Sequence, residues 1–150
     1  MASPGRVRVT MNQKILVHLL DYAWTADRQD APSATTQLGI ATTLRARRSH
    51  VTLSLAALRE RGLVEDRTTR IVGGRRRKKA YALTPLGYQR AREARAFLES
   101  MPVQLLDDGA EIALSRVPER LGRALDLTEL LPWLRPDGIL DARPLGIPSS

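Results

Sequence analysis

The chain has 150 residues, of which 43% are hydrophobic and 27% charged, with no cysteine and a formal net charge of +8. This composition is typical of a folded globular protein, and the absence of cysteine excludes disulfides, thiolate metal sites and a cysteine nucleophile. No apolar run approaches the roughly 20 residues that cross a bilayer, and no apolar segment of a secretory signal follows the N-terminus, so we expect a cytoplasmic protein.

The predicted elements begin after a flexible leader over residues 1–9. Apolar residues at helical spacing predict a first helix over residues 11–22. His18 lies beside these apolar positions, and we expect it to be a partly exposed helix residue rather than a ligand. Residues 24–33 contain Pro32 and several turn formers, which predicts a loop. Trp24 is expected to be a core or interface residue.

Two further helices follow closely. Thr36 can cap a helix that ends at about Leu44, and its inner face is predicted to consist of Leu38, Ile40, Ala41 and Leu44. After a basic turn over 45–47, a third helix is predicted over 48–61. Its buried stripe is formed by residues at i, i+4 and i+7, namely Val51, Leu55 and Leu58. Gly62 is well placed to end this helix in the left-handed conformation.

A β-hairpin and a fourth helix come next. The strands are predicted over 63–72 and 75–84, joined by a two-residue turn at Gly73-Gly74, where both positions can take a positive φ. Alternation along the second strand sends the side chains of residues 75–79 to both faces, so we expect three of these five to reach phosphates. Thr84 is the expected N-cap, and Pro85 the first residue, of a helix that extends to about Ser100.

The character of the sequence changes after residue 100. A small hairpin is predicted over 103–106 and 110–114, followed by short helices over 115–125 and 127–134. Residues 101–150 carry five basic and eight acidic residues. We therefore expect four parts: the leader, a domain over 10–100, a small α/β extension over 101–143 that serves dimerisation or partner binding, and a tail over 144–150.

The basic residues are concentrated in one stretch. Residues 45–79 contain 12 Lys and Arg against three acidic residues, a net charge of +9. A solvated basic face or an arginine-rich coding bias could also enrich arginine, but a bias would not gather the charge into one segment. Such clustering is the electrostatic signature of a protein that binds a phosphate backbone.

Three helices, a glycine-tipped hairpin and a further helix are the order of a winged helix-turn-helix domain. We predict a mostly helical α+β fold in which the third helix enters the DNA major groove and the hairpin forms a basic wing. The residues expected to contact bases are Arg48, Ser49, His50 and Thr52. The residues expected to contact phosphates or the minor groove are Arg45, Arg47, Arg75, Arg76, Arg77, Lys78 and Lys79.

The segments SHVTLSLAALRERGLVE (49–65) and RIVGGRRRKKAYALTPLG (70–87) resemble archaeal winged-helix regulators that are distantly similar to the MarR group. In those proteins a recognition helix ending in L..RGLV precedes a basic wing and a Y.LT..G helix start. The resemblance covers about residues 10–95 and implies a transcription regulator. Residues 101–141 are similar to a strand-rich extension found there, and some members precede an ATPase region. Arg47 stands where a small polar N-cap is usual.

Other interpretations stay open at this point. His50 could be an ordinary surface residue, Arg59 and Arg61 could simply complement the helix dipole, and residues 75–79 could be a localisation-type basic patch. The whole domain could instead bind RNA or another protein, as part of a larger regulatory ATPase. We predict no cofactor, no metal site and no enzymatic activity. The expected partners are double-stranded DNA and a second copy of the chain.

Overall fold

The computed structural model describes residues 8–22 and 30–145. These form two compact units, one comprising residues 11–94 and the other residues 8–10 and 95–145. Most of the predicted leader, Trp24 and most of the predicted tail lie outside the described residues. Within the second unit, the Val9 N–H donates to the Pro136 carbonyl at 3.1 Å. The boundary between the units falls inside one long helix.

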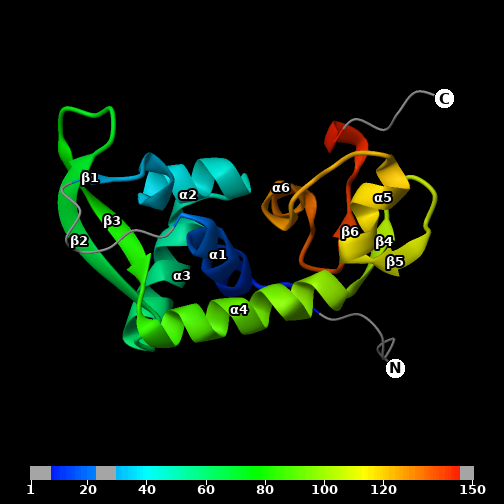
Figure 1. Cartoon of the computed structure of the whole chain (residues 1–150), viewed down its shortest axis with the longest axis horizontal. Helices are drawn as coiled ribbons and strands as arrows, with labels where there is room; N and C mark the ends of the chain where they lie inside the picture. Colours follow the sequence, from blue (N-terminus) through cyan, green and yellow to red (C-terminus); the bar gives the residue numbers. More distant parts are fainter. Residues whose placement is uncertain (1–7, 23–29, 146–150) are drawn as a thin grey trace. The chain divides into compact units, whose positions relative to one another are not determined.

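The unit 11–94 has a winged-helix fold, as the sequence predicts (Figure 1). Its sheet has the order β1-β2-β3, in which β2 runs antiparallel to β3 and parallel to β1. The β2–β3 hairpin, which we call the wing, extends past the helices of this unit. The elements are α1 (Met11–Asp21), β1 (Asp30–Ala31), a 3-10 turn (Ser33–Thr35), α2 (Gln37–Leu44), α3 (Arg48–Glu60), β2 (Val64–Ile71), β3 (Arg77–Leu83) and the first part of α4 (Pro85–Ser100).

Local capping fixes where these helices begin and end. The Thr36 hydroxyl accepts a hydrogen bond from the Gly39 N–H at 3.0 Å, and the Thr84 hydroxyl does the same for Gly87. Gly62 has a φ of 75°, so it ends α3 in the left-handed conformation, as predicted. The predicted stripe of α3 is fully buried. Leu38 was expected on the inner face of α2, but its side chain is 52% exposed.

His18 differs from its expected environment. It is fully buried, because the six consecutive residues 14–19 of α1 are all buried and the helix is covered on every side. The His18 Nε2 lies 2.8 Å from the Ala34 carbonyl and donates to it, while Nδ1 has no hydrogen-bond partner among the described residues. Burial lowers the pKa of His18 from 6.5, because the imidazolium would lose its hydration there.

The tip of the wing is wider than the predicted two-residue turn. Arg70 pairs with Arg77, so the connecting loop holds six residues, 71–76. Only Gly73 of the glycine pair has a positive φ, and the Gly74 N–H closes a turn on the Ile71 carbonyl at 2.9 Å. The loop is wider than predicted because of β1, a strand that lies in the region 24–33 where a loop was expected. The Val72 N–H donates to the Ala31 carbonyl of β1, so the end of β2 pairs with β1 and not with β3.

The second unit contains a small sheet of order β5-β4-β6, with β4 antiparallel to β5 and parallel to β6. The β4–β5 hairpin was predicted, whereas β6 was not. The core of this unit is rich in leucine, and the largest fully buried side chains include Leu98, Leu114, Leu130, Leu131, Leu134 and Leu140. The elements are β4 (Pro102–Leu105), β5 (Glu111–Ala113), α5 (Val117–Leu121), α6 (Leu127–Leu130), β6 (Ile139–Leu140) and 3-10 turns at Leu114–Arg116, Leu131–Trp133 and Arg143–Leu145.

No helix within residues 8–22 and 30–145 combines the length and the apolar character needed to cross a membrane.

Candidate nucleic-acid interface

The first turns of α3 present the residues predicted to contact bases. Arg48, Ser49, His50 and Thr52 are all exposed to solvent, because the buried stripe of this helix faces α1 and α2. The N-cap is Arg47, whose side chain makes no capping hydrogen bond. The backbone N–H groups of the first turn therefore lack a side-chain acceptor from the N-cap, and two exposed arginines flank them.

The turn between α2 and α3 places further positive charge at the same end. Arg45 adopts the left-handed conformation, with a φ of 53° and a ψ of 41°. A residue other than glycine pays a steric cost there, of order 1 kcal/mol or more. The turn is closed by a hydrogen bond from the Ala46 N–H to the Ala41 carbonyl at 2.9 Å. Both Arg45 and Arg47 are exposed, so this tight turn gathers cations beside the start of α3.

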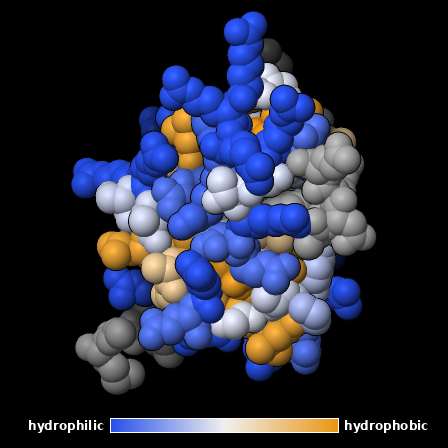
Figure 2. Space-filling view, turned by 90° about the vertical axis from the view of Figure 1, so that its left-hand side faces the viewer, coloured by the Kyte–Doolittle hydropathy of each residue, from blue (hydrophilic) through white to orange (hydrophobic). Residues whose placement is uncertain are grey.

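All five predicted wing cations are exposed. The first three residues of β3 are exposed and the last four are buried, which shows that the strand leaves the domain body at about Lys79. Hydrophilic side chains accordingly crowd the end of the wing (Figure 2). The Arg77 guanidinium donates to the Thr68 carbonyl at 3.1 Å. Within the described residues, the side chains of Arg75, Arg76 and Lys78 make no hydrogen bond or ion pair.

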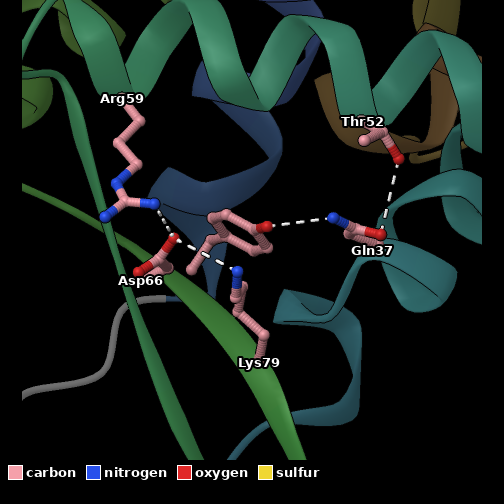
Figure 3. A network of polar contacts seen from close by, with 6 residues as sticks. Gln37, Thr52, Arg59, Asp66 and Lys79 are labelled. Carbon is pink, nitrogen blue, oxygen red and sulfur yellow. Dashed lines mark hydrogen bonds and ion pairs between the residues drawn. The ribbon is translucent and has the colours of Figure 1, made fainter.

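Asp66 joins α3 to both strands of the wing. Its carboxylate on β2 lies 2.9 Å from the Arg59 guanidinium of α3 and 3.9 Å from the Lys79 ammonium of β3 (Figure 3). The Asp66 side chain is only 14% exposed, against 60% for Arg59 and 51% for Lys79. Asp66 is thus partly buried between two cations, whereas the other acidic residues of segment 45–79, Glu60 and Glu65, are exposed.

A second set of polar contacts joins α2, α3 and β3. The Gln37 side-chain amide donates to the Tyr81 hydroxyl at 3.0 Å, and its carbonyl oxygen lies 3.4 Å from the Thr52 hydroxyl (Figure 3). Thr52 also lies 2.8 Å from the Arg48 carbonyl. A hydroxyl has one hydrogen to donate, and the shorter contact is the stronger one. Thr52 therefore retains its lone pairs and its methyl group for contact with a ligand.

The sequence did not reveal Gln37, Asp66 or Tyr81 as members of this region. Asp66 carries one weak signal, because it is an acidic residue inside a strongly basic segment. Gln37 and Tyr81 are 44 positions apart, and no local pattern connects them. Their contact depends on the packing of α2 against the base of the wing.

The electrostatic result is a surface with a large excess of positive charge. All 12 basic residues of segment 45–79 are exposed, and the exposed acidic residues in it are Glu60 and Glu65. Such a field attracts polyanions and accelerates their binding at low ionic strength. Among residues 8–22 and 30–145, no group of three or more His, Asp or Glu residues could hold a metal ion.

Comparisons with known proteins give likeness in structure only. No family model and no curated protein matches the chain. A MarR family transcription regulator shares 24% sequence identity over 59% of this chain and 50% of its own, with a TM-score of 0.43. A mutant MepR from a multidrug-resistant S. aureus isolate shares 22% sequence identity over 62% of this chain and 59% of its own, with a TM-score of 0.43. A mutant of Lactococcus lactis ZitR shares 22% sequence identity over 83% of this chain and 68% of its own, with a TM-score of 0.49. The match thus spans 50–59% of the first two proteins.

Proposed function

We propose that this chain binds double-stranded DNA through α3 and the wing, and that it regulates transcription by doing so. The observation that carries the proposal is the arrangement of charge. Every cation of segment 45–79 is exposed, and these cations lie at both ends of α3 and along a wing that extends from the domain. An α-helix fits the major groove of B-DNA, and a hairpin beside it can follow the backbone or the minor groove.

The two parts of this surface have different tasks. Arg48, Ser49 and His50 offer hydrogen-bond donors and acceptors at the start of α3, and Thr52 offers an acceptor and a methyl group, so these four contact base edges. The phosphate or minor-groove contacts come from Arg45, Arg47 and residues 75–79. Arg75, Arg76 and Lys78 contribute most, because their side chains have no other partner among the described residues. Arg77 and Lys79 each have a contact within the domain, with the Thr68 carbonyl and the Asp66 carboxylate respectively, which competes with a phosphate.

The proposed binding form is a homodimer. A winged helix-turn-helix domain gains affinity and specificity by occupying two half-sites about 34–36 Å apart. The residues beyond 100 form a leucine-rich unit with its own sheet, and we assign the contact between copies to this unit. A two-fold symmetric DNA site would follow from such a dimer.

The division of tasks is testable with two sets of variants. Replacing Arg75 and Arg76 together by Ala should weaken binding to all duplexes alike and reduce the salt dependence by about 0.9 per lost phosphate contact. Replacing Ser49 or His50 by Ala should instead change which duplexes are enriched from a random library. The matched control is Arg116→Ala with Arg135→Ala, which removes the same charge from the second unit and should leave binding unchanged.

Two outcomes would contradict the proposal. If both sets of variants affected all sequences equally, α3 would not contact bases. If the native chain preferred an RNA duplex of the same sequence, the surface would belong to an RNA-binding module. The deep, narrow major groove of A-form RNA does not admit an α-helix.

A further inference from the structure

The solvent-facing side of α3 has an apolar middle. Ser49, Leu53, Ala56 and Glu60 follow one another at helical spacing opposite the buried stripe, and all four are exposed. Leu53 has 71% of its surface exposed, the largest fraction of any large hydrophobic residue in the described chain. A leucine and an alanine therefore occupy the part of the helix that would lie deepest in a groove.

The same stretch lacks the residues that recognise guanine. A guanine in the major groove is contacted best by Arg or Lys, whose donors meet its O6 and N7 atoms. Between Arg48 and Arg59, α3 contains no Arg or Lys. The only apolar group that a base pair presents in the major groove is the C5-methyl of thymine. Leucine and alanine side chains match that group and no other feature of the base edges.

We infer that Leu53, assisted by Ala56, contacts thymine methyl groups, so that the preferred DNA carries thymine beneath the middle of α3. The inference rests on the proposed DNA binding and specifies the sequences that are bound. Leu53 is then a specificity-determining residue in addition to the residues at the helix start. The polar Ser49 and Arg48 contact the base pairs on one side of this thymine step.

The charges around Leu53 favour DNA over a protein as the occupant. The apolar area consists of two residues, whereas a stable protein interface buries about 800 Å² on each partner. Cations lie at both ends of the helix, with Arg45, Arg47 and Arg48 at its start and Arg59 and Arg61 near its end. A small apolar centre between cations complements a groove that is lined by phosphates and contains methyl groups.

The test removes one methyl group at a time from the DNA. The native full chain is used to enrich duplexes of about 24 base pairs, enough for two half-sites, from a random library. Each thymine of an enriched duplex is then replaced by uracil, which lacks only the C5-methyl. Affinities are measured for the native chain, for Leu53→Ala, and for Leu86→Ala as a matched change of another exposed leucine, which lies on α4.

The expected result is a loss of about fourfold at one or two thymines for the native chain and for Leu86→Ala. This is the effect of burying one methyl group, about 0.8 kcal/mol. Leu53→Ala should bind the thymine duplex more weakly and show no further loss with uracil.

Full uracil sensitivity in Leu53→Ala, or none in the native chain, would overturn the inference while leaving DNA binding intact. A change in oligomeric state without any change in DNA binding would assign Leu53 to a contact between copies and overturn it too. Failure of the native chain to bind any duplex would refute the proposed function itself.

Discussion

Asp66 forms ion pairs with two cations of the proposed DNA-binding surface. It neutralises part of the charge of Arg59 and Lys79 and holds both beside the junction of α3 and the wing. The two cations of these ion pairs are more than half exposed, so water screens each pair and its contribution to stability is small, about 1 kcal/mol or less. The consequence of Asp66 therefore lies in the positions of the two cations more than in the stability of the fold.

Replacing Asp66 by Asn should free Arg59 and Lys79 for phosphates. We expect tighter binding to random duplexes at low salt and a steeper salt dependence, by about 0.9 for each cation that gains a phosphate. Preference among sequences should decrease, because the added contacts carry no base information. Anisotropy titrations across a range of salt concentrations measure both quantities. An unchanged salt slope would show that Asp66 has no influence on phosphate contacts.

His18 makes the stability of the domain depend on pH. Burial lowers its pKa in the folded chain below the value of 6.5 that it has when unfolded. Below pH 6.5 the unfolded chain therefore binds the proton more readily, so stability is lost as the pH falls through 6.5 toward the lowered pKa. Above pH 6.5 this contribution is constant.

The variant His18→Gln keeps a donor for the Ala34 carbonyl and cannot be protonated. Its melting temperature should fall less than that of the native chain between pH 7.5 and pH 5, values on either side of the unfolded pKa. The matched control is His50→Gln, which makes the same change at an exposed position of α3, and its melting temperatures at the two pH values are compared with those of the native chain and of His18→Gln. Equal falls in the native chain and in His18→Gln would show that another group causes the acid sensitivity.

At the scale of elements, α3 begins with an arginine that does not cap it. Replacing Arg47 by Ser supplies an oxygen that can accept from the first-turn N–H groups, which is worth about 0.5–2 kcal/mol. The same change removes a cation beside the proposed DNA surface. We therefore expect Arg47→Ser to raise the melting temperature and to weaken duplex binding. If Arg47→Ser raised both the melting temperature and the affinity for duplex DNA, or lowered both, there would be no functional reason for the uncapped helix.

The elements that the sequence predicted are those with local causes. Each of the capping residues acts within a few residues of its own position. The starts of α2 and α4, at Thr36 and Thr84, and the end of α3, at Gly62, could therefore be recognised from local sequence patterns alone. β1 could not be predicted, because its two residues form a strand only by pairing with Arg70 and Ile71, about 40 positions later in the chain. The glycine pair indicated a hairpin correctly but not its loop, whose width depends on that same distant pairing.

The candidate site divides in the same way. The exposure of Arg48, Ser49 and His50 follows from the spacing of the buried stripe on α3. The network around Asp66 and Gln37 depends on which helix packs beside which strand, so charge and spacing in the sequence do not reveal it. Leu53 lies off the buried stripe of α3, and the sequence analysis did not single it out. Its 71% exposure distinguishes it from a core residue.

For the whole molecule, the residues before and after position 100 carry net charge of opposite sign. Residues 1–100 hold 19 basic and eight acidic residues, whereas residues 101–150 hold five and eight. The wing unit can therefore attract a polyanion while the residues after 100 repel it. This asymmetry is the reason that we place DNA on α3 and the wing and assign the contact between copies to the second unit.

The central claim is that this surface binds duplex DNA by neutralising phosphates, and a salt titration of the native chain tests it most directly. The logarithm of the binding constant for a random duplex should fall linearly with the logarithm of the salt concentration. With three to five phosphate contacts from the wing and the start of α3, the slope should be about −2.7 to −4.5. The absence of duplex binding at low salt, or binding that does not depend on salt, would contradict the claim.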